Sequence, residues 1–167
     1  IASAEKSLQH FHTDRLDCLL IHRPDYLMQA DEVAEAFNTL RARGDVLHFG
    51  VSNFTTSQFE LLQSRLDFKL VTNQIEMSPL QMGALEDGTL NLCQQHQISP
   101  MLWSPLAGGG LFAETEQAQR VRSALQSVAE ETGLDSVDQV AYAWLLTLPC
   151  QPSVILGTGK LARIQSA

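Results

Sequence analysis

The chain contains 167 residues, of which 44% are hydrophobic and 18% charged, and its formal net charge is -8. This composition is typical of a soluble globular domain with a sizeable core, and the acidic balance disfavours binding to nucleic acid or to an anionic membrane. The three cysteines, Cys18, Cys93 and Cys150, are far apart and show no CxxC spacing, which indicates reduced thiols and argues against a metal site. No signal peptide, lipidation motif or membrane-spanning run is visible, so a cytoplasmic protein is expected.

Apolar periodicity in the first half of the chain predicts amphipathic helices that alternate with short buried strands. Residues 2–11 place apolar side chains on one helical face, and residues 16–21 form an apolar run that suits a parallel strand. The elements expected next are a helix capped by Asp31 and ended by Gly44, a strand over residues 46–51, a helix capped by Thr55 or Thr56, and a strand over residues 70–75.

The second half continues the same alternation. The expected elements are a helix near residues 84–96, a strand over 98–103, a glycine-rich loop after Pro105, helices over 116–132 and 136–148, a strand near 153–156, and a short helix opened by Gly157-Thr158-Gly159-Lys160. Such alternation predicts βαβ units and a parallel sheet.

Five strands fit either an open doubly wound sheet or part of a closed barrel. No GxGxxG follows the first strand, which disfavours a dinucleotide-binding open sheet. We therefore predict an α/β fold, a partial TIM (β/α)8 barrel of about five parallel strands with flanking helices. It is expected to form one truncated domain over residues 1–167.

Polar side chains stand where three of these apolar runs end. His22 follows the first strand, where its imidazole could polarise a substrate carbonyl or could simply cap backbone groups. Ser52 and Asn53 follow the second strand, and Gln74 lies near the end of the third. A hydroxyl and two amides can bind a ligand carboxamide, although Ser-Asn before a capped helix is also ordinary turn chemistry.

Two later segments could also bind a ligand. Trp103 ends the fourth strand, where it could stack on a flat ring or belong to the core. The glycines of the loop after it permit close approach of a ligand to the backbone. Near the end of the chain, Gly157, Thr158 and Gly159 precede Lys160 and Arg163. This combination of backbone N–H groups and cations is either a small anion site or a solvated face.

Three stretches of the sequence give a resemblance to a known family. They are Leu20-Ile21-His22-Arg23-Pro24, Phe49-Gly50-Val51-Ser52-Asn53-Phe54 and Asn73-Gln74-Ile75-Glu76. Over nearly its whole length the chain resembles the aldo-keto reductase family, and within it a YdhF-type bacterial branch. The resemblance implies a TIM barrel that uses NADPH to reduce a small aldehyde or ketone to an alcohol by hydride transfer.

The resemblance also implies roles for individual residues. His22 matches the catalytic histidine that orients the substrate. Ser52, Asn53 and Gln74 match the residues that bind the nicotinamide carboxamide, and Trp103 matches the residue that stacks on the nicotinamide ring. The family's loop over the cofactor pyrophosphate corresponds to Ser104, Pro105, Leu106, Gly108 and Gly109. Its site for the adenosine 2'-phosphate corresponds to Gly157, Thr158, Gly159, Lys160 and Arg163. Family members commonly have a lysine at the position of Gly157 and a Glu-Asn pair near Ser166 and Ala167, so the adenine contacts have no match here.

In the family, three other catalytic residues come from the first three βα units of the barrel: the proton-donating tyrosine, a lysine and an aspartate. By the resemblance, this chain corresponds to the later units and contains none of these three residues. Neither Tyr26 nor Tyr142 lies in a matching position. We therefore expect the truncated chain to be inactive alone and to self-associate, most simply as a symmetric dimer that covers its open sheet edges. The alternative is a non-catalytic self-associating or nucleotide-binding module derived from the barrel.

Overall fold

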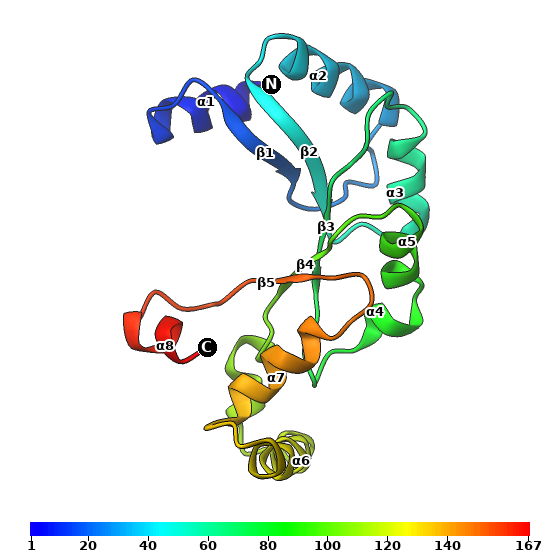
Figure 1. Cartoon of the computed structure of the whole chain (residues 1–167). Coiled ribbons are helices and arrows are strands. Elements are labelled where there is room, and N and C mark those ends of the chain that lie inside the picture. The colour runs from blue at the N-terminus through cyan, green and yellow to red at the C-terminus, as the bar shows by residue number, and fades with distance from the viewer. The chain divides into compact units, whose positions relative to one another are not determined.

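The computed structural model describes residues 1–167 and alternates helices with short parallel strands (Figure 1). The strand order in the sheet is β1-β2-β3-β4-β5, and the predicted parallel α/β fold is confirmed. The strands are β1 (Leu16–Ile21), β2 (Val46–Ser52), β3 (Asn73–Glu76), β4 (Met101–Trp103) and β5 (Ser153–Val154). The chain divides into two compact units, Ile1–Gln74 and Ile75–Ala167, and each is described by itself.

The first unit contains α1 (Ala2–Phe11), α2 (Ala30–Ala42) and α3 (Thr56–Gln63) besides its strands. β1 pairs with β2 in parallel register, so that Leu16 lies opposite Val46 and Ile21 lies opposite Val51. The core of the unit contains Phe49, which is 0% exposed and stacks on Phe37 with ring centroids 4.2 Å apart. Burial of such large apolar side chains stabilises the fold by roughly 1.5–3 kcal/mol each.

Local sequence signals mark the start of α3 and the end of α2 in the first unit. Thr55 caps α3 in a reciprocal capping box with Gln58, and Gly44 follows α2 with a φ of 77°. The prediction that Asp31 caps α2 is wrong, because the helix begins at Ala30 after an extended Gln29. Asp31 lies in the first turn, where a carboxylate still favours the positive end of the helix dipole.

The third strand is shorter than the predicted residues 70–75, but the segment before it still bonds to β2. The backbone N–H of Val71 donates to the carbonyl of Phe49 at 2.8 Å, and the N–H of Val51 donates to the carbonyl of Thr72 at 3.0 Å. Ser52 then lies opposite Gln74 in the parallel register of β2 and β3. Hydrogen bonding to β2 thus begins before β3 itself.

The second unit contains α4 (Gly83–Glu86), α5 (Thr89–Gln95), the 3-10 segment η1 (Ala107–Phe112), α6 (Glu116–Thr132), α7 (Val137–Leu146) and α8 (Leu161–Ser166). The predicted single helix over 84–96 is two helices, because Gly88 has a φ of 84° and Asp87 accepts a hydrogen bond from the N–H of Thr89 at 2.9 Å. The predicted helix over 116–132 is confirmed as α6. Thr115 caps its start, and Gly133 ends it with a φ of 73°.

The core of the second unit includes buried leucines from β4, α7 and η1, and β5 contacts both β4 and α7. Leu102 of β4, Leu145 of α7 and Leu111 of η1 are all 0% exposed. The buried thiols of Cys93 and Cys150 line one cavity, and Cys18 of the first unit is exposed. No helix is both long and apolar enough to cross a membrane.

Candidate cofactor and substrate sites

In the first unit, the strand-end residues form one hydrogen-bonded group, the amide cluster (Ser52, Asn53 and Gln74). The Ser52 hydroxyl donates to the carbonyl oxygen of Gln74 at 2.9 Å, and the backbone N–H of Asn53 donates to the same oxygen at 2.9 Å. The side-chain Nδ2 of Asn53 donates to Ser52 Oγ at 3.0 Å and to the carbonyl of His22 at 3.4 Å. The ends of β1 and β2 are thus joined to Gln74, which is the second residue of β3 and not its end as predicted.

The backbone of Asn53 is left-handed, with a φ of 59°. Among residues with a side chain, asparagine adopts this conformation most readily. The turn it makes aims the Asn53 carboxamide back across the strand ends, toward Ser52 and His22. The conformation of one residue therefore decides whether the amide cluster forms.

A buried residue outside the predicted site holds this turn. Asn73 is 0% exposed, and its Nδ2 donates to the carbonyl of Phe54 at 2.8 Å, while its Oδ1 accepts from the N–H of Phe54 at 3.4 Å. This reciprocal pairing satisfies both backbone groups directly after Asn53. The only signal for Asn73 in the sequence is its place beside Gln74 in the same motif. Nothing near Asn73 in the sequence indicates that its side chain bonds to the backbone of Phe54.

Gly50 in the same motif has a packing role. A Cβ built on it would lie 2.6 Å from Leu20 Cδ2 and 2.9 Å from the carbonyl oxygen of Thr72. No side chain fits between these strands, so the glycine lets β1, β2 and the segment before β3 approach closely.

Two side chains of this group are available to a ligand. The His22 side chain is exposed, and the carboxamide of Gln74 is half-buried with no hydrogen bond to the rest of the chain. A free carboxamide offers one donor group and one acceptor, which is the complement of a primary amide on a ligand. The first unit can therefore orient a ligand amide beside an imidazole.

In the second unit, the segment after β4 is a kinked 3-10 turn and not an open loop. Ser104 has a φ of 53°, Gly108 of 62° and Gly109 of 94°. A Cβ on either glycine would meet nothing within 4 Å, so these glycines are required by backbone conformation and not by crowding. Trp103, at the end of β4, is half-buried. The glycine loop (η1, Ala107–Phe112) thus exposes backbone at its centre.

The anion segment (residues 157–163) leads into the short helix α8. Thr158 Oγ1 accepts a hydrogen bond from the N–H of Lys160 at 3.2 Å, and the side chains of Lys160 and Arg163 are exposed. The structure therefore places the two predicted cations on one exposed helix, with Lys160 as its N-cap residue and Arg163 within it. Neither cation forms an ion pair within the chain, so both charges can face a solvent anion.

Residues of α7 hold α8 in place. Gln139 Nε2 donates to the carbonyl of Ser166 at 2.7 Å, and Gln139 Oε1 accepts from the N–H of Asp135 at 3.0 Å. Partial burial, aided by the charge of Asp138, raises the pKa of the Tyr142 hydroxyl, and the guanidinium of Arg163 opposes that rise. Arg163 thus lies near enough to α7 to act on Tyr142, and Gln139 fixes the end of the helix that bears it.

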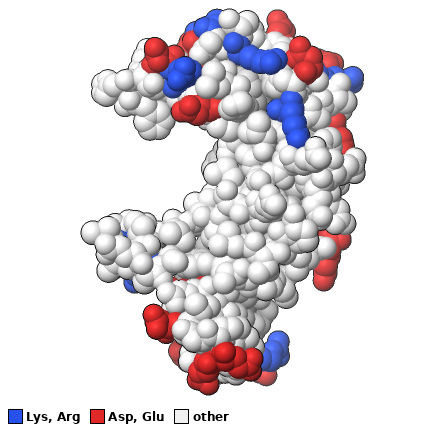
Figure 2. All heavy atoms as spheres, viewed as in Figure 1, with Lys and Arg blue, Asp and Glu red and all other residues white.

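Acidic side chains gather over α6 in Figure 2, where that helix carries Glu116, Glu130 and Glu131. Such a surface repels phosphate. Within the second unit, the anion segment is therefore better suited to phosphate than the face of α6.

Comparison with known proteins defines the class of the chain. The profile of the aldo/keto reductase family matches residues 1–167, and the chain belongs to this family. Two similar solved structures are a thermostable aldo-keto reductase bound to the inhibitor epalrestat (26% identity, TM-score 0.88, 99% of this chain and 57% of that one) and an aldo/keto reductase from Klebsiella pneumoniae in complex with NADP and acetate (28% identity, TM-score 0.81, 99% and 56%). The predicted partial α/β barrel agrees with both.

Among curated relatives, the chain is 56% identical to oxidoreductase YdhF of Escherichia coli over 167 residues, which is 100% of this chain and 56% of that protein. It is 46% identical over 165 residues to a 6-dehydroglucose reductase of Agrobacterium fabrum, covering 99% of this chain and 54% of that protein. The chain therefore spans about half the length of the curated relatives it matches.

Proposed function

We propose that this chain forms the cofactor-binding part of an NADPH-dependent aldo-keto reductase that reduces an aldehyde or ketone to an alcohol. The observation that carries the proposal is the amide cluster beside His22 in the first unit. A family member in complex with NADP and a relative named for reduction of a dehydroglucose support the cofactor and the carbonyl substrate.

In this proposal the amide cluster holds a nicotinamide carboxamide. The Gln74 side chain supplies the donor and acceptor that the ligand amide needs, and Asn53 and Ser52 fix its position through their own hydrogen bonds. Bound NADPH would supply the hydride. The exposed imidazole of His22 would donate a hydrogen bond to the substrate carbonyl oxygen, which orients the carbonyl and makes its carbon more electrophilic.

Lys160 and Arg163 would bind the adenosine 2'-phosphate, which NADPH has and NADH lacks. The supporting observation is that Lys160, the N-cap residue of α8, and Arg163, within that helix, are both exposed and form no ion pair within the chain. Thr158 would contribute its hydroxyl as a further donor. The adenine contacts have no assigned residue.

The chain supplies no suitable proton donor in this proposal. Tyr26 is 99% exposed in the loop after β1, and Tyr142 lies on α7 with a raised pKa. By family resemblance, the tyrosine that protonates the alkoxide lies in βα units other than those of this chain. Loss of one group that stabilises developing charge costs about 2.7–4 kcal/mol in comparable sites, so we infer that the chain alone binds NADPH without turning over substrate.

The second candidate function is a non-catalytic self-associating module. The observation that favours it is β1, which pairs only with β2 and has half-buried Leu19 and Leu20 at an edge of the sheet. An unpaired parallel edge beside apolar side chains favours association with a second copy. Light scattering across micromolar concentrations measures the molar mass of the free chain and shows whether it is a monomer or a dimer.

Calorimetric titration with NADPH and with NADH tests the proposed function. Wild-type chain should bind NADPH more tightly, Gln74→Ala should weaken both cofactors alike, and Lys160→Ala with Arg163→Ala should weaken NADPH alone. Lys6→Ala, which removes an exposed cation of α1, is the matched control and should change neither. Equal affinity for the two cofactors would contradict the phosphate assignment, and aldehyde-dependent NADPH oxidation by the free chain would contradict the missing proton donor.

A further inference from the structure

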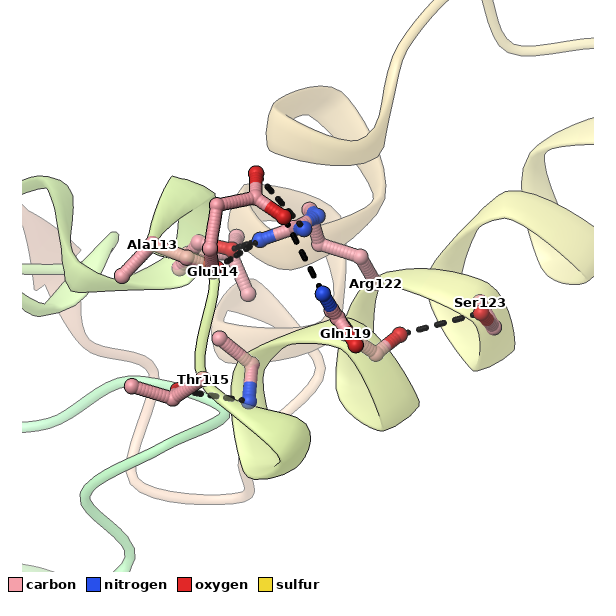
Figure 3. Close-up of polar contacts among 8 residues, drawn as sticks. Ala113, Glu114, Thr115, Gln119, Arg122 and Ser123 are labelled. Atoms are coloured by element: carbon pink, nitrogen blue, oxygen red, sulfur yellow. Dashed lines mark hydrogen bonds and ion pairs between the residues drawn. The ribbon is translucent and has the colours of Figure 1, made fainter.

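Arg122 of α6 donates to two backbone carbonyl groups at the end of the glycine loop. Its Nη1 lies 2.7 Å from the carbonyl oxygen of Leu111 and 2.6 Å from that of Ala113 (Figure 3). The side chain is 23% exposed, and its Nη2 lies 3.7 Å from Glu114 Oε1. Hydrogen bonds from a charged donor are shorter and about twice as strong as neutral ones.

A small network orients the guanidinium. Gln119 Nε2 donates to Glu114 Oε2 at 3.0 Å, so the carboxylate that faces Arg122 is itself held from α6 (Figure 3). Thr115 Oγ1 accepts from the N–H of Ala118 at 3.2 Å and fixes the start of the same helix. The charge of Arg122 is therefore directed inward to backbone oxygens and is not part of an anion site.

The two carbonyls flank Phe112, the last residue of the glycine loop. At the other end of the loop, the N–H of Ala107 donates to the carbonyl of Ser104 at 2.7 Å, directly after β4. Between these fixed ends, Gly108 and Gly109 are exposed and left-handed. The loop is thus fastened at both ends. At its exposed centre the N–H of Gly109 donates to the carbonyl of Leu106 at 3.0 Å, and the two glycines, which have no side chains, let a ligand approach the backbone closely.

We propose that Arg122 is a positioning residue that holds the glycine loop in the conformation that covers the pyrophosphate of a bound dinucleotide, and so limits how fast the cofactor leaves. This inference rests on the proposed function. A loop that is already ordered loses less conformational entropy when it closes on a ligand. Loop opening also sets the release rate of ligands in many enzymes.

The test compares Arg122→Lys with Arg120→Lys. Lysine keeps the charge, but it is shorter and lacks the planar guanidinium whose Nη1 donates to both carbonyls while its Nη2 faces Glu114. Arg120 is exposed on the same helix and makes no hydrogen bond or ion pair in the chain. Two measurements are made: amide hydrogen exchange over residues 107–113 without cofactor, and the NADPH dissociation rate by stopped flow.

Arg122→Lys should accelerate both exchange and NADPH dissociation by about tenfold, the effect expected for loss of one charged hydrogen bond. Arg120→Lys should change neither. A merely structural role for Arg122 would lower the thermal midpoint and leave the dissociation rate unchanged. Glu114→Gln removes only the exposed carboxylate that orients Arg122, so it should act in the same direction with a smaller effect, even where Arg122→Lys folds poorly.

Three outcomes would overturn the inference. Unchanged exchange in Arg122→Lys would show that the loop does not depend on the arginine. Faster exchange with an unchanged dissociation rate would show that the loop is anchored but does not retain cofactor. Absence of NADPH binding in the wild-type chain would refute the proposed function, and faster exchange would then leave Arg122 as an anchor with no role in cofactor release.

Discussion

The amide cluster of the first unit and the anion segment of the second are built in opposite ways. In the amide cluster, strand ends fix the residues, and Ser52, Asn53 and Gln74 bond to one another. In the anion segment, an exposed helix of 6 residues bears the cations, and Gln139 of another helix holds its end. Disruption of the first site should therefore cost mainly stability, whereas disruption of the second should cost mainly ligand selectivity.

The largest effect is expected from Asn73→Ala. The variant leaves the N–H and carbonyl of Phe54 buried without their partner, and each such group costs about 1–3 kcal/mol. We expect the free energy of unfolding to fall by roughly 2–4 kcal/mol in urea denaturation. Asn38→Ala, at an exposed position of α2, is the control. A decrease in the free energy of unfolding no larger than that of Asn38→Ala would show that Asn73 does not hold the turn.

Gly50→Ala should have the next largest effect. The added methyl group would lie 2.6 Å from Leu20 Cδ2, and forced overpacking of a core costs about 1–3 kcal/mol. Gly83→Ala is the matched control, because its Cβ would lie 3.6 Å from Gln81 Oε1. Urea denaturation of the two variants gives the comparison, and equal stability would contradict the close approach of the strands at Gly50.

Gln139→Ala should affect selectivity more than stability. Loss of its hydrogen bond to Ser166 costs about 0.5–1.5 kcal/mol, and α8 then loses its fixed position. We expect NADPH to bind severalfold more weakly and NADH to bind as before, measured by calorimetry. Gln95→Ala, exposed on α5, should change neither affinity. An equal loss for both cofactors would mean that α8 does not contact the 2'-phosphate.

The smallest effect near neutral pH is expected from Cys93. Burial raises the pKa of its thiol to about 12, and the nearby Cys150 adds to the rise; the ordinary value is 9.0. Between these values the folded chain keeps a proton that the unfolded chain has lost. The contribution of Cys93 to stability should thus be complete below pH 9 and be lost as the pH rises toward 12.

Urea denaturation at a series of pH values checks this expectation. Cys93→Ala should flatten the decline of the unfolding free energy above pH 9, because it removes the titrating group. Cys18→Ala removes an exposed thiol of the first unit whose pKa is also raised by partial burial, so it should flatten the decline less than Cys93→Ala does. If the unfolding free energy of Cys93→Ala fell with pH as steeply as that of the wild-type chain, groups other than Cys93 would cause the decline above pH 9.

The elements that could be predicted from the sequence are those whose ends are encoded locally. The boundaries of α6 follow from the cap at Thr115 and from Gly133. The prediction failed where a local break interrupts an apolar pattern, as at Gly88 between α4 and α5, because the pattern continues across the break.

The same division holds for the sites. His22, Ser52 and Asn53 could be chosen because parallel strands bring their carboxyl ends to one edge of a sheet. Gln74 was chosen by the same argument, although it is the second residue of β3. Asn73 and Arg122 could not be chosen in this way. Each acts on backbone groups 9 to 19 residues away in the sequence, and no spacing rule connects a side chain to a distant carbonyl.

The two hydrogen bonds of Arg122 Nη1 also set a limit on how this chain can be lengthened. The guanidinium binds two carbonyls that are two residues apart, at Leu111 and Ala113, so an extra residue between them would move one oxygen out of reach. A Cβ at Gly108 or Gly109 would meet nothing within 4 Å, so there is room for a side chain at these positions, but an insertion there would alter the loop that we propose covers the pyrophosphate. Engineered tags or epitopes therefore belong outside this loop, and the stretch from Leu111 to Thr115 should be kept at its present length.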